Sequence, residues 1–221
     1  MIAASALPGH LTVVSCRLDD DSDLPLSTAL NVLDAEEVAR RRRFVYPRDA
    51  DRFTRSRGFL RLCLSEDLDM PAHRIPIAYG PAGKPYVPGA DLEFNISHAG
   101  ALAVLAISYT GPVGIDLEFA GRGARLEGDL AGLTRRCMTP AEQEAIFAET
   151  GAARSRRFLE FWTAKEARMK LTGEGMHLAP KSIELQLRAG RATGYLSPSA
   201  PPASLAYHAM KDHNAICCVA T

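Results

Sequence analysis

The sequence predicts an α+β protein made of two similar halves, for two reasons. Short apolar runs that end at glycine, proline or acidic turns indicate strands, whereas residues 48–68 and 153–171 have the length and periodicity of helices. A strand, then helices, then antiparallel strands follow one another, and this order begins again at Gly114. We therefore expect one half over residues 1–112 and another over 113–221, each large enough to hold a core of its own.

The first half is expected to begin with a strand over residues 11–18, which the acidic turn at 19–23 ends. Two helices follow, around residues 27–44 and 48–68, because Pro47 must interrupt the helical pattern between them. This half closes with strands near residues 74–79, 84–87, 92–97 and 101–108, with turns at 80–83 and 98–100.

The second half is expected to repeat this order of elements. A strand over residues 115–118 is followed by a mostly helical stretch over 122–147, in which Thr139-Pro140-Ala141-Glu142 has the residues of a helix cap and first turn. The long helix over residues 153–171 comes next. Strands at 182–188, 192–196, 205–210 and 215–219 then close the chain.

The composition is that of a folded protein with balanced charge. The 221 residues include 26 basic and 26 acidic side chains, so the formal net charge of zero argues against a histone-like or tail-type polyelectrolyte. No stretch approaches the roughly 20 apolar residues of a membrane helix, and the N-terminal residues lack the basic start and apolar run of a signal peptide. We therefore expect a cytoplasmic protein with no membrane partner.

The cysteines and the absence of several common motifs exclude further classes of protein. The five cysteines are scattered through apolar runs, which is typical of core residues in a reducing compartment. The sequence has no Cys-x-x-Cys, His-Glu-x-x-His, Gly-x-Ser-x-Gly or Walker motif, which argues against zinc ribbons, zincins, common hydrolases and P-loop enzymes.

An arginine-rich segment is the first candidate binding feature. Residues 40–61 contain nine arginines against Asp49 and Asp51, a surplus of seven positive charges. The planar guanidinium suits phosphate oxygens, so a site for a polyphosphorylated ligand is one interpretation. A solvated arginine-rich face is the other, and from charge alone it is the more common one. A nucleic-acid patch is less favoured, because the sequence lacks interleaved aromatics around a recognisable nucleic-acid-binding module.

Two carboxylates on one expected strand form the second candidate feature. In Gly114-Ile115-Asp116-Leu117-Glu118, alternation places Asp116 and Glu118 on the same face of the strand. A hard cation such as Mg²⁺ binds oxygen ligands of this kind, usually together with water and substrate phosphate. The acidic outer face of an edge strand would give the same pattern.

Two further groups of polar residues are candidate features. Glu166 and Lys170 are four residues apart on an apolar, aromatic helix, which is an unusual setting for a simple surface ion pair. His98 follows an apolar strand at a tight turn, where an imidazole can meet a phosphate, although a lone histidine there more often has a structural role.

Taken together, these residues resemble the 4′-phosphopantetheinyl transferase superfamily, in particular the two-domain type that activates surfactin synthetase. The matching blocks follow the family order over most of the chain. They are the basic segment through Asp49-Ala50-Asp51-Arg52, Gly83-Lys84-Pro85, Phe94-Asn95-Ile96-Ser97-His98, Gly114-Ile115-Asp116-Leu117-Glu118 and Trp162-Thr163-Ala164-Lys165-Glu166-Ala167-Arg168-Met169-Lys170.

The resemblance implies a fold of two α+β halves related by pseudo-twofold symmetry, and a reaction. The enzyme would be a monomer that binds coenzyme A and Mg²⁺ or Mn²⁺. It would transfer 4′-phosphopantetheine to a serine of an acyl or peptidyl carrier protein and release adenosine 3′,5′-bisphosphate. The carriers would serve fatty-acid, polyketide or nonribosomal peptide synthesis. The nucleophile then belongs to the partner, which would explain why this chain has no nucleophile motif. The alternative is a non-catalytic module that binds coenzyme A or another nucleotide.

The resemblance also implies roles for individual residues. Asp116, Glu118 and Glu166 would hold the metal, and Lys170 would contact the α-phosphate. The residues that would contact the other phosphates of coenzyme A are Arg52 at the 3′-phosphate, Lys84, Ser97 and His98, with Lys165 as a weaker candidate. Arg40 is included as one of four consecutive arginines, Arg40 to Arg43, among which the resemblance does not choose. Either Glu166 or Glu142 would accept the serine proton. The carrier would dock near Met138 and residues 44–47.

Overall fold

The computed structural model describes residues 3–7, 11–122, 128–196, 203–210 and 213–221. The chain divides into two compact units. The first unit comprises Met1–Tyr79 and Pro85–Thr110, and the second comprises Gly80–Lys84 and Gly111–Thr221. The second unit thus includes a short segment from the first half of the sequence, which the pattern of elements does not predict.

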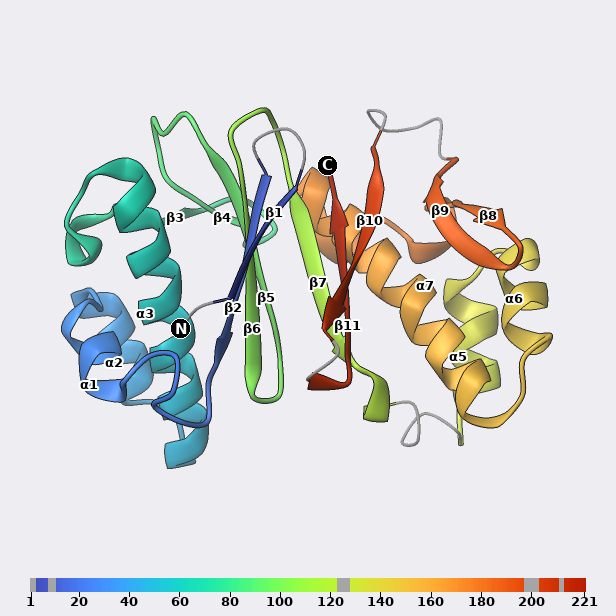
Figure 1. The fold of residues 1–221 in the computed structure, drawn as a ribbon, viewed down its shortest axis with the longest axis horizontal. Helices are drawn as coiled ribbons and strands as arrows, with labels where there is room; N and C mark the ends of the chain where they lie inside the picture. The colour runs from blue at the N-terminus through green and yellow to red at the C-terminus, as the bar shows by residue number, and fades with distance from the viewer. Residues whose placement is uncertain (1–2, 8–10, 123–127, 197–202, 211–212) are drawn as a thin grey trace. The chain divides into compact units, whose positions relative to one another are not determined.

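The first unit contains a four-stranded antiparallel sheet with helices on one side of it (Figure 1). The strand order is β1 (Ala3–Leu7), β2 (Leu11–Arg17), β6 (Leu102–Ser108) and β5 (Glu93–Ala99). The helices are α1 (Leu26–Asn31), α2 (Ala35–Arg41) and α3 (Pro47–Leu68), and a separate short hairpin joins β3 (Ala78–Tyr79) to β4 (Pro85–Tyr86).

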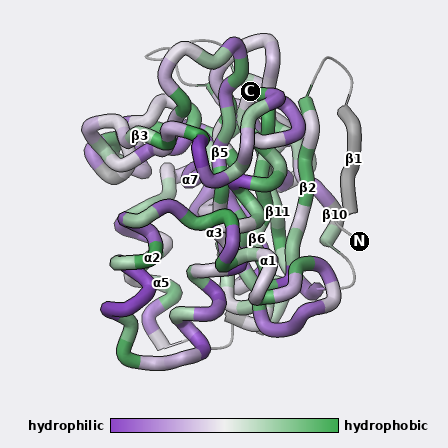
Figure 2. The backbone as a smooth tube through the Cα atoms, turned by 90° about the vertical axis from the view of Figure 1, so that its left-hand side faces the viewer, coloured by the Kyte–Doolittle hydropathy of each residue, from purple (hydrophilic) through white to green (hydrophobic). Residues whose placement is uncertain are grey.

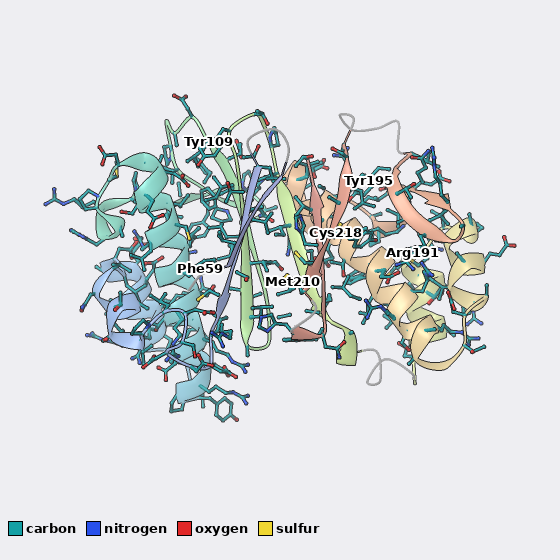
Figure 3. The ribbon with its side chains drawn as sticks, viewed as in Figure 1. Phe59, Tyr109, Arg191, Tyr195, Met210 and Cys218 are labelled. Carbon is teal, nitrogen blue, oxygen red and sulfur yellow. The ribbon has the colours of Figure 1, made fainter. Side chains whose placement is uncertain are left out.

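The core of the first unit lies between α3 and the sheet. Phe59, which is labelled in Figure 3, and Leu60 have no exposed surface and pack with residues of β2, β5 and β6. The backbone of α3 also lies very close to α1, because a Cβ on Gly58 would lie 2.7 Å from the Cα of Ala29. Figure 2 shows hydrophilic and hydrophobic residues alternating along the helices of this unit. The arginine-rich segment lies on these helices, since residues 40–61 run from the end of α2 through most of α3.

The single helix expected over residues 27–44 is wrong, because the structure has two helices there. The first ends at Asn31 and the second starts at Ala35. Asp34 ends the connection with a capping box, in which its side chain accepts from the N–H of Glu37 and the Glu37 side chain accepts from the N–H of Asp34. This reciprocal pairing satisfies two backbone donors and favours a new helix start.

The second unit contains a three-stranded antiparallel sheet in the order β10 (Leu205–Met210), β11 (Ala215–Ala220) and β7 (Gly114–Phe119). A separate hairpin joins β8 (Leu185–Arg188) to β9 (Arg191–Tyr195). The helices are α5 (Leu130–Cys137), α6 (Pro140–Phe147) and α7 (Gly151–Thr172). In the core, Ile216 and Cys218 of β11 pack with Phe161 and Ala164 of α7 (Figure 3 labels Cys218).

Most expected elements are present, and the α+β class is confirmed. The expected strand at 74–79 is shorter, since a 3₁₀ turn occupies Ala72–Arg74, and the one at 182–188 starts only at Leu185. Strand β1 was not expected. Residues 123–127 of the expected helical stretch lie outside the described part of the chain. The predicted pseudo-twofold symmetry stays a prediction.

Within the described residues, no helix combines the length and the hydropathy that crossing a membrane would require.

Candidate functional site

The second unit places a pair of buried carboxylates against its longest helix. Asp116 and Glu118 lie on β7 and are 5% and 9% exposed. The first residue of this strand, Gly114, makes the close approach of β7 to α7 possible. A Cβ there would lie 2.0 Å from the carbonyl oxygen of Ala167 and 2.4 Å from the backbone nitrogen of Leu171. Only glycine fits this position without moving one of the two backbones.

This close approach forms an ion pair between strand and helix. The Nζ of Lys170 lies 2.6 Å from Oδ1 of Asp116. Asp116 therefore faces α7, and Glu118, two residues along the strand, shares that face. Glu166 lies one turn before Lys170, and both are half-buried in a helix that is otherwise largely buried. The structure thus places these four predicted residues on two neighbouring elements.

The donor set suits a hard cation, although the side chains are not arranged around one. Asp116 already contacts one cation, the Lys170 ammonium, and carboxylate oxygens are the ligands that Mg²⁺ takes with water and substrate phosphate. Within the described residues, no group of three or more His, Cys, Asp or Glu side chains is arranged to hold a metal ion. The residues fit a metal that takes part of its coordination from a bound phosphate.

The predicted Lys84 belongs to the second unit. Its Nζ donates to the carbonyl oxygens of Val113 and Leu171, at 3.0 and 3.1 Å. These carbonyls are adjacent in the chain to Gly114 and Lys170. Lys84 therefore links the start of β7 to the end of α7 through hydrogen bonds. These are the two elements that carry the carboxylates.

The first unit contains a hollow of about 440 Å³ that brings other predicted residues together. Its lining includes Arg40, Arg52 and His98, all three of which were predicted to contact phosphates. The rest of the lining is Leu18, Phe44, Asp49, Phe53, Ser56 and Gly100. Ser97, next to His98 on β5, is only 6% exposed and does not line this hollow. The hollow is the candidate phosphate pocket.

Two aromatic side chains in this pocket were missed at the level of sequence. The rings of Phe44 and Phe53 lie 5.2 Å apart between centroids, and the guanidinium of Arg40 lies 5.2 Å from the Phe53 centroid. Such a cation–π contact orients the arginine. The signal was present in the sequence, since both phenylalanines lie within the arginine-rich segment.

Most of the arginine-rich segment is neutralised within the first unit. Six of its nine arginines pair with carboxylates, several of them distant in sequence. The pairs are Arg41 with Asp51, Arg48 with Asp49, Arg52 with Asp19, Arg55 with Asp21, Arg57 with Glu37, and Arg61 with Glu37 and Asp34. Arg61 is fully buried. The segment is therefore not a free patch carrying seven surplus charges, and Arg40 and Arg52 are the two of its arginines that line the pocket.

Glu142 and Lys165 occupy a different environment from the one their predicted roles require. Both side chains are 0% exposed, and Nζ of Lys165 lies 2.7 Å from Oε2 of Glu142. Lys165 also donates to the carbonyl oxygens of Pro180 and Ile183, and Glu142 accepts from the N–H of Leu185. Burial lowers the pKa of Lys165, and the charge of Glu142 opposes this effect. Because both side chains are fully buried and paired with each other, we include neither Glu142 as a base nor Lys165 as a coenzyme A contact in the proposal below.

Comparisons with known proteins identify the family of this chain. Residues 112–220 match the family model described as the 4′-phosphopantetheinyl transferase superfamily. Residues 21–110 match the one described as 4′-phosphopantetheinyl transferase, N-terminal. The two matches together cover most of both units.

Individual relatives have the same family name. The chain is 33% identical over 179 residues to the 4′-phosphopantetheinyl transferase HetI of Nostoc sp., covering 76% of this chain and 74% of that protein. It is 27% identical over 172 residues to a 4′-phosphopantetheinyl transferase of Bacillus subtilis, covering 75% of this chain and 74% of that one. It is 31% identical over 169 residues to the human L-aminoadipate-semialdehyde dehydrogenase-phosphopantetheinyl transferase, covering 72% of this chain and 54% of the human protein. The chain belongs to the 4′-phosphopantetheinyl transferase superfamily.

Proposed function

We propose that this protein transfers the 4′-phosphopantetheine group of coenzyme A to a serine of an acyl or peptidyl carrier protein. The observation that carries the proposal is the Asp116–Lys170 ion pair, formed where β7 meets α7 beside Glu118 and Glu166. A module that only bound a nucleotide would need cationic side chains for the phosphates and no buried carboxylates. A transferase that acts on a pyrophosphate needs carboxylates to hold a metal ion and a cationic side chain to neutralise the leaving group.

In the proposed reaction, the carrier serine oxygen attacks the β-phosphorus of coenzyme A. The bond from that phosphorus to the bridging oxygen breaks, and adenosine 3′,5′-bisphosphate leaves. Asp116, Glu118 and Glu166 are the residues that would hold Mg²⁺ or Mn²⁺. When bound, this ion would act as a Lewis acid toward the pyrophosphate oxygens. Lys170 stabilises the charge that develops on the departing α-phosphate.

The serine must lose a proton as its oxygen attacks. Glu166 is the proposed acceptor, because it is half-buried on the accessible stripe of α7, one turn from Lys170. Glu142, the other predicted base, is enclosed by its pair with Lys165. A carboxylate within reach of both the metal site and the entering hydroxyl is suited to general-base catalysis.

The candidate phosphate pocket would take the adenosine 3′-phosphate. Arg52 and Arg40 supply guanidinium donors there, and His98 is exposed at the end of β5. Phe44 and Phe53 supply an apolar wall of the kind on which a flat base can lie. Asp49 is the acidic residue of this lining and reduces its net positive charge.

We also propose that the protein acts as a cytoplasmic monomer that docks its carrier through an apolar surface. Of the two regions predicted for docking, Met138 is 0% exposed and cannot contribute its side chain. In the other, Val45 and Tyr46 are 85% and 68% exposed. Exposed apolar side chains of this size favour contact with a protein partner.

The test is a transfer assay with coenzyme A, Mg²⁺ and a panel of apo carrier proteins from fatty-acid, polyketide and peptide synthesis. We expect mass spectrometry to show one added phosphopantetheine on at least one carrier. Asp116→Asn and Glu166→Gln should each abolish the transfer. Glu144→Gln changes an exposed carboxylate on α6 and serves as the matched control with unchanged activity. No mass gain on any carrier would refute the proposal.

A further inference from the structure

The acidic turn that follows β2 holds arginines of α3. The Asp19 carboxylate accepts from Nε and Nη2 of Arg52, at 2.5 and 2.7 Å. Asp21 of the same turn accepts from Nη2 of Arg55 at 2.7 Å. Arg55 also donates to the carbonyl oxygens of Leu18 and Leu24, which fastens the turn to the helix through its backbone. This second anchor keeps Asp19 in place independently of its own pair with Arg52.

The bond to Asp19 leaves a usable edge of the Arg52 guanidinium. A guanidinium has five N–H donors in a rigid plane, and the bidentate pair takes the edge formed by Nε and Nη2. The N–H groups of Nη1 and the second N–H of Nη2 are not used in this pair. One N–H from each of these two nitrogens points in the same direction, so together they can donate to two oxygens of a phosphate. Arg52 lines the candidate phosphate pocket, whereas Asp19 does not.

We propose that Asp19 is a positioning residue that fixes the Arg52 guanidinium for recognition of the 3′-phosphate of coenzyme A. This inference rests on the proposed function. A free arginine side chain loses much rotamer freedom when it binds a ligand, and a carboxylate that fixes it beforehand removes part of that loss. Asp19 thereby favours coenzyme A over dephospho-coenzyme A without contacting either.

Asp19 could instead weaken phosphate binding, because its carboxylate would repel the phosphate. The charges around Asp19 argue against such repulsion. The hydrogen bond from Arg52 lowers the pKa of Asp19, and the nearby charges of Arg48 and Arg55 lower it further, against an opposing effect of burial. The carboxylates of Asp19, Asp21 and Asp49 are each paired with an arginine here, Arg52, Arg55 and Arg48, so this region carries no surplus negative charge. Asp19 is also 42% exposed, so solvent screens its charge from a neighbouring phosphate.

The test compares Asp19→Asn with wild type on two ligand pairs. Steady-state kinetics with coenzyme A and dephospho-coenzyme A give KM and kcat. Calorimetry with adenosine 3′,5′-bisphosphate and adenosine 5′-phosphate gives affinities that do not depend on transfer. We expect the KM for coenzyme A and the Kd for the bisphosphate to rise about fivefold, with kcat and both constants for the ligands without a 3′-phosphate unchanged.

Asp21→Asn is the matched control, because it breaks the neighbouring ion pair of the same turn and leaves the Asp19–Arg52 pair intact. It should preserve the preference for coenzyme A. A thermal unfolding midpoint for each variant separates loss of fold from loss of recognition. An unchanged preference in Asp19→Asn, or tighter binding of the bisphosphate, would overturn the inference. If wild type neither binds coenzyme A nor transfers phosphopantetheine, the proposed function itself fails.

Discussion

The ion pair between Glu142 and Lys165 shows how strongly burial changes the meaning of a charged residue. Both residues are fully buried, and backbone groups contribute the further hydrogen bonds. Removing one partner leaves the other as an uncompensated charge in a medium of low polarity, which is strongly destabilising. The structural role of the pair can therefore be separated from a catalytic one by measuring stability and turnover together.

We expect Lys165→Met to lower the free energy of unfolding by about 3 kcal/mol in chemical denaturation. The double variant with Glu142→Gln should recover part of this loss, because it leaves no unpaired charge. As a control, Arg136→Met breaks an ion pair in which both side chains are about 70% exposed and should cost less than about 0.5 kcal/mol. A Lys165→Met protein of normal stability but without turnover would contradict the structural role.

Single residues were also where the sequence was least informative. The sequence counts the arginines in residues 40–61 but does not show that most of them pair with carboxylates of the first unit. The partner of Arg52 lies 33 residues away, and the two partners of Arg61 lie on the helix start at Asp34 and Glu37. Local charge counts cannot include such partners, because they depend on how the chain folds back on itself.

At the scale of elements, hydrophobic periodicity predicted the long helices and the buried strands well. The number of apolar residues is high enough to reveal a helical or strand periodicity in α3, in α7 and in the hairpin of β5 and β6. Prediction failed where a helix boundary depended on a capping residue, and where a strand was built of small side chains. The capping box at Asp34 divides one apparent helix in two, and β1 is built of Ala, Ser and Leu, which carry little strand signal.

The contact between β7 and α7 is the element-scale feature on which the carboxylate site depends. We expect Gly114→Ala to force the strand and helix apart, because the new methyl group would overlap backbone atoms that cannot rotate away. Overpacking of this kind costs about 1–3 kcal/mol or more. It should also lengthen the 2.6 Å Asp116–Lys170 contact and reduce turnover beyond the loss of folded protein.

The matched control for this change is Gly121→Ala, since a Cβ on Gly121 would meet nothing within 4 Å. Denaturation curves and transfer rates, corrected for the folded fraction, compare the two variants. Equal stability and equal turnover for both would show that the close approach of β7 to α7 is not required.

For the whole molecule, the sequence predicted the α+β class, which the structure confirms, and it named some of the residues that line the pocket and most of those around the carboxylates. It did not predict how those residues group. Arg40, Arg52 and His98 share a pocket in the first unit, whereas Lys84 belongs with the carboxylates in the second. Such grouping depends on long-range packing, for example of residues 80–84 with the second unit, and no local pattern encodes it.

This grouping predicts that recognition and chemistry can be lost separately. The pocket of the first unit offers guanidinium donors to a phosphate, whereas the carboxylates of the second unit serve the reaction. We expect Asp116→Asn to abolish transfer while the Kd for adenosine 3′,5′-bisphosphate changes less than about twofold. We expect Arg52→Ala to raise the KM for coenzyme A at least tenfold, the loss typical of a charge-assisted hydrogen bond, while it leaves a measurable kcat.

Removal of divalent metal with a chelator should reproduce the Asp116→Asn result and not the Arg52→Ala result. Transfer should stop and return on addition of Mg²⁺ or Mn²⁺, because the carboxylates are the groups suited to hold the ion. Binding of the bisphosphate, followed by calorimetry in the same buffer, should persist because guanidinium–phosphate contacts need no metal. Parallel loss of binding and transfer in all three experiments would show that the two sets of residues cannot be separated, and would contradict this division of roles.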